Sequence, residues 1–400
     1  MEQHRAVVVG AGIGGLTAAA ALCGRGWDVT VLERAADLAP VGAGIGLAPN
    51  ALRALDVIGL GDRVRELAAW QGDGGMRRPD GRWLARTDAR AAAARFGGPL
   101  VLLHRATLVD LLLSALPEGT VRTGAPAALA DPGDTRRPAR VTTPDGELEA
   151  GLLVAADGIR SAVRTALFPA HPGPRYSGFT TWRTVIPAPE RPFAPHETWG
   201  PARVWGSQPL KDGRVYAYAM AAAPAGAHAP DGEKAELLRL FGDWHHPVPA
   251  ILDAADGTTV LRHDVHHLID PLPAFHAGRT ALLGDAAHAM QPTLGQGGNQ
   301  AVEDAIVLAH HIGGGPAGGG LPVPAALAAY TADRLPRTTA VVRRAARTGR
   351  LALLSARPAV ALRDAAVTAV SRFGPGLVLR GFDGIADWRP PTSAQPSRVS

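Results

Sequence analysis

The feature that most constrains the fold is a glycine-rich segment near the N-terminus, residues 10–15 (GAGIGG). It directly follows the apolar run 6–9, and a second apolar run, 29–32, ends in Glu33. A strand, a glycine turn, a helix over 16–23, a second strand and an acid at this distance form the pattern that binds an ADP moiety. The sequence therefore predicts a nucleotide-binding β-α-β unit.

The glycines of this turn have different physical tasks. Gly10 permits the tight turn, Gly12 lets the backbone approach a pyrophosphate, and Gly15 lets the helix pack closely on the strand. The pyrophosphate then lies at the helix N-terminus, where free N–H groups and the helix dipole favour negative charge. Glu33 can accept hydrogen bonds from a ribose hydroxyl. These residues alone do not distinguish FAD from NAD or NADP.

Composition excludes several classes of protein. The 400 residues suffice for one large domain or two interleaved ones. A single cysteine, Cys23, excludes internal disulfides and cysteine-rich metal sites. Neither a signal peptide nor a run of transmembrane length is visible, which predicts a cytoplasmic protein that is not integral to the membrane. The net charge of +5 comes from scattered arginines, so we expect no nucleic-acid partner.

Two later segments also carry strand-loop-helix signals. The buried run 152–156 ends at Asp157, although an ordinary helix cap is an equally good interpretation of this aspartate. The strand 280–284 is followed by Asp285, and residues 295–299 (GQGGN) open a helix with one apolar stripe. Asp285 can hold a ribityl hydroxyl, and a helix start stabilises the negative charge of a reduced flavin.

Between these signals the periodicity changes. Residues 179–268 form alternating strands, in which Tyr216, Tyr218 and Met220 share one face. Residues 70–98 show no regular period. A sheet-forming segment therefore interrupts a nucleotide-binding fold whose last parts follow it.

The three segments, in this order, resemble those of the FAD-dependent monooxygenases of the para-hydroxybenzoate hydroxylase type, the group A aromatic-ring hydroxylases. The resemblance extends from Arg5 to about Pro390. It implies an α/β fold: a Rossmann-type, glutathione reductase-like FAD-binding domain interleaved with a β-sheet substrate domain, plus C-terminal helices. The expected boundaries are 1–69, 100–174 and 276–312 for the FAD-binding domain, 70–99 and 175–275 for the sheet domain, 325–384 for the helical segment and 385–400 for a flexible tail.

The resemblance also implies bound FAD, with NADH or NADPH as co-substrate. The first motif and Glu33 would hold the ADP half, Asp157 would lie near the pyrophosphate, and Asp285 would hold the ribityl chain. Arg105 resembles the family's flavin-contacting arginine, and the glycines from 295 would face the isoalloxazine. The full expected set is Gly10, Gly12, Ile13, Gly14, Gly15, Glu33, Arg34, Gly44, Arg105, Asp157, Gly284, Asp285, Pro292, Gly295, Gly297, Gly298 and Asn299.

The reaction implied is that of a single-component enzyme, because no second nucleotide motif follows a strand. Reduced flavin and O₂ would form a C4a-hydroperoxide that hydroxylates or epoxidises an electron-rich substrate. The face with Tyr216 favours a hydrophobic aromatic, polycyclic or terpenoid compound. Tyr216 and Arg203 are the candidate catalytic residues, through a hydrogen bond to a substrate oxygen and through pairing with a carboxylate or phenolate. A packed tyrosine and a surface arginine are the alternatives.

Other functions are kept open or disfavoured by particular residues. Thr184 breaks the Trp-x-Trp-x-Ile-Pro motif of flavin halogenases, and Thr293 after Pro292 replaces the acid of urate-oxidising members. A reductase or dehydrogenase would carry the same FAD motifs, and a non-catalytic nucleotide-binding sensor is a further alternative. His263, His266 and His267 are interspersed with Asp264, which favours a solvated edge, so no metal is expected. We expect a monomer or homodimer.

Overall fold

A parallel sheet is built around the first strand of the chain, β1 (Arg5–Val9). The computed structural model describes residues 4–38, 43–69, 73–313, 321–372 and 380–391. Within them, the sheet has six strands in the order β17-β18-β11-β1-β2-β7, and only β17 pairs antiparallel. Continuous apolar runs suit this sheet because both of its faces are covered. The other bounds are β2 Asp28–Leu32, β7 Val121–Arg122, β11 Leu152–Ala155, β17 His276–Ala277 and β18 Thr280–Leu282.

Helix α1 (Ile13–Cys23) follows β1 and is buried on nearly every side. An apolar surface all round is typical of a helix enclosed by other elements. It lies beside α10 (Gly297–Ile312), which begins at the glycine segment that follows β18. The predicted β-α-β unit and the α10 helix are therefore confirmed. Helices near this sheet are α2 Pro49–Asp56, α3 Gly61–Arg65, α5 Arg105–Leu113, α6 Ala162–Leu167 and α9 Asp285–His288.

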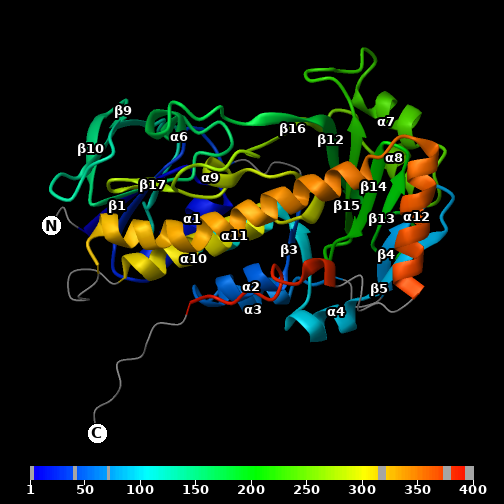
Figure 1. Ribbon diagram of the computed structural model, residues 1–400, viewed down its shortest axis with the longest axis horizontal. Coiled ribbons are helices and arrows are strands. Elements are labelled where there is room, and N and C mark those ends of the chain that lie inside the picture. The colour runs from blue at the N-terminus through cyan, green and yellow to red at the C-terminus, as the bar shows by residue number, and fades with distance from the viewer. Residues whose placement is uncertain (1–3, 39–42, 70–72, 314–320, 373–379, 392–400) are drawn as a thin grey trace, which may run out of the picture.

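A second sheet of seven strands stands beside the first region (Figure 1). One of its faces packs under α7 and α8 through residues such as Trp182, Trp205 and Phe241. The opposite face carries Val204 and Met220, which are buried together with Ala352 of the long C-terminal helix. The strands are β16 Leu261–His267, β12 Arg175–Pro187, β15 Arg214–Ala222, β14 Arg203–Pro209, β13 His196–Gly200, β4 Asp73–Arg77 and β5 Trp83–Asp88, and the helices are α7 Glu233–Phe241 and α8 Val248–Ala254.

Strands β4 and β5 lie in the segment 70–99, which the family resemblance, and not any local pattern, assigned to the sheet domain. Residues 70–98 have no regular period, yet residues 73–88 complete the edge of the seven-stranded sheet. Pairing between β4 and the distant β13 creates this edge, so no local pattern reveals it. Short elements finish the fold: β3 Gly44–Leu47, β6 Val101–His104, β8 Ala128–Asp131, β9 Ala139–Thr143, β10 Gly146–Ala150, α4 Ala89–Phe96, η2 Pro292–Leu294 and η3 Arg380–Phe382.

The C-terminal part is helical, in α11 (Val323–Ala352) and α12 (Arg357–Arg372). The flexible tail expected from 385 is wrong for its first residues. Ile385 and Ala386 are buried, and the Arg53 guanidinium donates to the carbonyl oxygens of Ala386 and Trp388. Residues 392–400 lie outside the described residues. No helix in the described part of the chain is long and apolar enough to cross a bilayer.

Candidate active site

The glycine turn after β1 has one open side. Gly10 has φ +104°, and a Cβ there would lie 2.4 Å from the carbonyl oxygen of Ala156. A Cβ at Gly15 would lie 2.0 Å from the Gly10 oxygen, so this glycine is required for close packing of α1. Gly12, by contrast, has no atom within 4 Å of the position that a Cβ would take. The free N-terminal end of α1 is therefore accessible at Gly12 and closed at Gly10 and Gly15.

Glu33 lies beside the start of α1. Its carboxylate accepts hydrogen bonds from the backbone N–H groups of Ala11, at 2.8 Å, and Ala35, at 2.9 Å. These bonds fix the carboxylate at the end of β2, where its remaining lone pairs could accept ribose hydroxyls. Arg34 is exposed, and no hydrogen bond fixes its side chain within the described residues.

Asp285 and Arg105 are surrounded by protein atoms and yet accessible to solvent. Protein atoms surround both closely enough that desolvation raises the pKa of Asp285 and lowers that of Arg105. Both residues are nevertheless solvent-exposed. They therefore lie in a concave region at the end of β18, called the flavin recess below, which protein atoms surround but which is open to solvent.

Asp157 extends the same line of polar groups toward the glycine turn. Its Oδ2 accepts from the Val163 N–H at 3.3 Å, while its Oδ1 is buried without a partner. An open helix N-terminus, a fixed acid, an unpartnered buried oxygen and a recessed carboxylate are the groups that a long polyhydroxyl diphosphate such as FAD requires. The residues present therefore fit FAD.

Several expected cofactor residues lie in closely packed positions and have no side chain free to contact a ligand. Ile13 is buried in the core, and a Cβ at Gly14 would meet Leu283 at 2.5 Å. A Cβ at Gly298 would lie 2.8 Å from Ile45. Asn299 was expected to face the flavin, but its side chain bonds the backbone of Ala48, Gly46 and Gly295. It joins β3 to the loop before α10 and could offer a ligand only its backbone.

Pro292, Gly295 and Gly297 lie in the segment that leads from η2 to the start of α10, beside the recess. Pro292 begins the short helix η2, and Gly295 ends it with φ +61°. Gly297 then starts α10, with the Asp285 carboxylate about 4.0 Å from the position of a Cβ. Gly284, the residue before Asp285, has φ +61°, so the turn after β18 requires glycine. The α10 start and the Asp285 turn are thus adjacent.

The seven-stranded sheet meets this region through Tyr216. A Cβ at Gly44 would lie 2.4 Å from the Tyr216 ring, so the ring packs directly on the β3 backbone. Tyr218, on the same face, donates its hydroxyl hydrogen to Glu197. Desolvation raises the pKa of both phenols, which are therefore neutral at physiological pH.

Arg203 does not lie at this site. In β14 it pairs with Ala221, on the face covered by α7 and α8. Its guanidinium donates to the Leu240 carbonyl and lies 5.7 Å from the Trp244 ring centre. Its neighbour Val204 occupies the face of Tyr216 instead. The location is inconsistent with the catalytic role expected for Arg203, and we assign it none.

A network of buried charges, which the sequence analysis did not predict, joins α9, α10 and α11 beside the turn that precedes Asp285. Asp304 of α10 accepts from the Gly284 N–H at 2.9 Å, contacts His288 Nε2 at 2.5 Å and pairs with Arg334 at 2.6 Å. Arg334 also pairs with Glu303 at 2.6 Å. The sequence signal that could have revealed this network is the pair of consecutive acids, Glu303 and Asp304, within an otherwise buried helix. The network fixes the backbone directly before Asp285.

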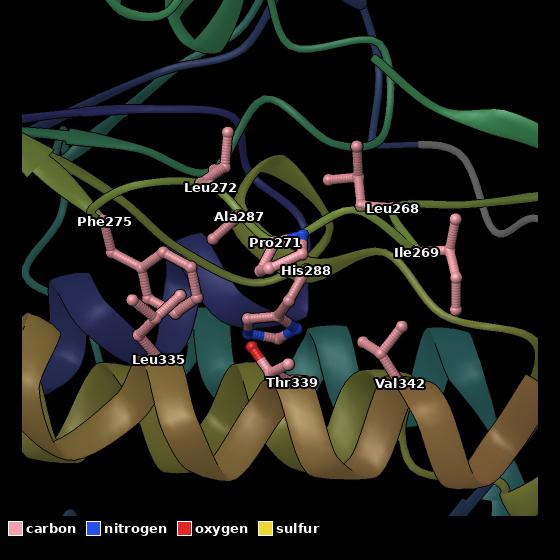
Figure 2. Close-up of a pocket in the computed structure, with 10 residues that line it drawn as sticks. All are labelled: Leu268, Ile269, Pro271, Leu272, Phe275, Ala287, His288, Leu335, Thr339 and Val342. Atoms are coloured by element: carbon pink, nitrogen blue, oxygen red, sulfur yellow. The ribbon is translucent and has the colours of Figure 1, made fainter. Parts of the chain in front are cut away.

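Figure 2 shows the His288 ring above α11, between Phe275 and Val342 and facing Thr339. The cavity beside it measures about 10 Å³, room for no more than one water molecule. It therefore cannot hold an organic substrate. Among the described residues, no three His, Cys, Asp or Glu side chains are placed to hold a metal ion.

The fold and the recess define a flavin-dependent oxidoreductase. The family model described as "FAD binding domain" matches residues 3–345. Aurachin C monooxygenase/isomerase of Stigmatella aurantiaca is 37% identical over 86% of this chain and 88% of its own. The 3-amino-4-hydroxybenzoate 2-monooxygenase PtnB3 of Streptomyces platensis is 37% identical over 96% and 97%. HpxO of Klebsiella pneumoniae, solved with FAD and uric acid, is 28% identical with a TM-score of 0.85 and 96% coverage of each chain.

The chain belongs to the FAD-dependent aromatic-ring hydroxylase family. The family resemblance, the fold class and FAD binding are thus confirmed.

Proposed function

We propose that this protein is a single-component monooxygenase that uses NADH or NADPH and O₂ to hydroxylate or epoxidise an electron-rich, largely hydrophobic aromatic substrate. The observation that carries the proposal is the contact of Tyr216 with Gly44, which brings the substrate-facing sheet against the flavin recess. Relatives whose names specify a hydroxybenzoate support an aromatic substrate. Bound FAD would supply the redox chemistry with NAD(P)H and O₂.

The chain's own residues would divide the binding of FAD among them. The open backbone at Gly12 would receive the pyrophosphate, Glu33 would hold the ribose, and Asp157 would lie near the pyrophosphate. Asp285 would hold the ribityl chain, and the α10 start would stabilise negative charge on the flavin ring. Arg105 would contact the flavin ring.

The sheet would orient the substrate and exclude water. Tyr216, kept neutral by burial, can donate a hydrogen bond to a substrate oxygen. The Tyr216 and Tyr218 rings, 5.5 Å apart, form an aromatic wall suited to a flat ring system.

The test follows the yellow colour of bound FAD in the absence of oxygen. Each of NADH and NADPH is mixed with the protein and a panel of phenols, naphthols and aromatic acids, and the rate of bleaching is recorded. We expect at least one compound to accelerate bleaching and to gain one oxygen atom by mass spectrometry when air is admitted. Bleaching without any oxygenated product would favour a reductase or dehydrogenase, and no bleaching at all would favour a sensor.

A further inference from the structure

Arg183 introduces a positive charge on the substrate-facing side of the seven-stranded sheet. In β12 it pairs with Tyr218 of β15 and Leu261 of β16. Its neighbour Trp182 is buried with α7 and α8, so alternation places Arg183 on the opposite face. The residue is partly exposed. It thus shares a face with the two tyrosines of the proposed substrate wall.

This charge has no counter-ion among the described residues. Arg262, one strand away, pairs with Asp264 at 3.0 Å and lies 3.9 Å from Glu233. The Arg183 guanidinium, in contrast, forms no ion pair and no hydrogen bond with any described side chain or carbonyl. An arginine that is partly removed from water and left without an acceptor provides a binding site for an anion.

The acid on the same sheet face is already engaged elsewhere. Glu197 lies on β13, which two strands, β15 and β14, separate from β12. With strands about 4.8 Å apart, this separation is about 14 Å. Glu197 also accepts from the Tyr218 hydroxyl and, at 3.0 Å, from Trp199 Nε1. It therefore does not neutralise Arg183.

The positive charge of Arg183 also acts on groups of the flavin recess. Desolvation raises the pKa of Asp285, and the positive charges of Arg105 and Arg183 are among the influences that oppose that shift. Desolvation also raises the pKa of Tyr216, again opposed by Arg183. The side chain thus lies within electrostatic reach of both the recess and the substrate wall. Arg105 is influenced by the opposite charge of Asp285 and by the like charge of Arg183, but among the described residues no ion pair joins Asp285 to either arginine.

We propose that Arg183 binds an anionic oxygen group, a carboxylate or a phenolate, on the aromatic substrate, and so determines substrate specificity. The proposal rests on the function proposed above. A planar guanidinium pairs with a carboxylate through two parallel hydrogen bonds, which fixes the orientation of the attached ring. The substrate would then be an aromatic acid or an acidic phenol, with its ring against Tyr216 and its anionic end at β12.

The experiment measures equilibrium binding to the FAD-loaded protein by titration calorimetry. The probes are 3-amino-4-hydroxybenzoate, salicylate and hydroxynaphthoate, each paired with its primary amide, which has the same shape without the charge. We expect at least one acid to bind the unaltered protein about tenfold more tightly than its amide, the usual effect of one charged hydrogen bond. Arg183→Gln should abolish this preference, and Arg183→Lys should retain part of it.

The matched control is Arg239→Gln. Arg239 is exposed on α7, across the sheet from the proposed site, and pairs with Asp231 and Glu236. This variant should keep the full preference for the acid. FAD occupancy is measured for every variant from its absorption spectrum, and it should not change.

Three results would overturn the proposal. The first is that no acid binds the unaltered protein more tightly than its amide. The second is that Arg183→Gln keeps the preference, and the third is that this variant loses FAD, which would assign the charge to the cofactor. Failure of the proposed function has a different signature: an acid whose binding depends on Arg183 but which is never oxygenated.

Discussion

At the scale of single residues, Gly12 and Gly15 separate ligand binding from folding. Because nothing surrounds a Cβ at Gly12, Gly12→Val should leave the thermal midpoint of the FAD-free protein within a few degrees of the unaltered value. The valine would occupy the space of the pyrophosphate, so FAD affinity should fall at least about a hundredfold, or about 3 kcal/mol. Fluorescence titration with FAD provides the measurement.

Gly15→Val is the comparison. Its Cβ would clash with the Gly10 carbonyl oxygen at 2.0 Å, so α1 would be displaced and the FAD-free protein should itself be destabilised. If Gly12→Val bound FAD normally, the diphosphate would not lie at this turn.

Asp285 provides a second test at residue scale. It is exposed and forms no hydrogen bond or ion pair with its side chain among the described residues, so Asp285→Ala should leave folding almost unchanged. Loss of a charged acceptor should weaken FAD binding by about 1.5–3 kcal/mol. Equilibrium dialysis at several FAD concentrations would measure the change, and an unaltered dissociation constant would place the ribityl chain elsewhere.

His196 should control part of the acid sensitivity of folding. Desolvation lowers its pKa to about 4, and its Nε2 is buried without a partner. Because the folded state binds the proton less readily than the unfolded chain, stability is lost as pH falls from the ordinary histidine value of 6.5 through about 4. The full loss is on the order of 3 kcal/mol.

His196→Phe keeps a ring beside His245, 5.2 Å away, and removes the titration. Urea unfolding at pH 7 and pH 4 should therefore show a smaller pH-dependent loss in the variant. An equal loss in both proteins would mean that other groups account for it.

At the scale of secondary-structure elements, α11 stabilises the flavin side of the molecule through Arg334. Removing one partner of a buried ion pair leaves uncompensated charge, so Arg334→Met should cost about 3–5 kcal/mol of unfolding free energy. Glu303 and Asp304 would be left buried without their cation. Arg343→Met, on the exposed side of the same helix, should cost less than about 0.5 kcal/mol. Similar costs for the two variants would contradict the proposed role of the network.

The elements also show what the sequence could predict. The run Val7–Val9, the glycine turn and the apolar helix after it are local patterns, so β1, α1 and β2 were predicted from them. Period-2 alternation placed Tyr216 and Tyr218 on one face of β15. The face of Arg203 depends on the register between β14 and β15, where it pairs with Ala221, and no local pattern contains that information. The Asp304 network likewise depends on which face of α11 meets α10.

At the scale of the whole molecule, α11 connects the flavin side with the sheet (Figure 1). The Thr293 hydroxyl in the loop before α10 donates to the Ala345 carbonyl at 2.6 Å. Beyond the end of the helix, the Leu354 carbonyl accepts from the Ala202 N–H at 2.8 Å, and Ala352 is buried against Met220. One helix therefore fixes the distance between the recess and the substrate wall, which orientation of substrate and cofactor requires.

The central claim is that one atom of O₂ enters an organic substrate at this junction. The direct measurement supplies isotopically labelled O₂ to the FAD-loaded protein, NAD(P)H and the compound that most accelerates flavin bleaching. We predict product with a single heavy oxygen atom, formed in proportion to the NAD(P)H consumed. Heavy oxygen found only in hydrogen peroxide and water, across the whole panel of aromatic compounds, would contradict it.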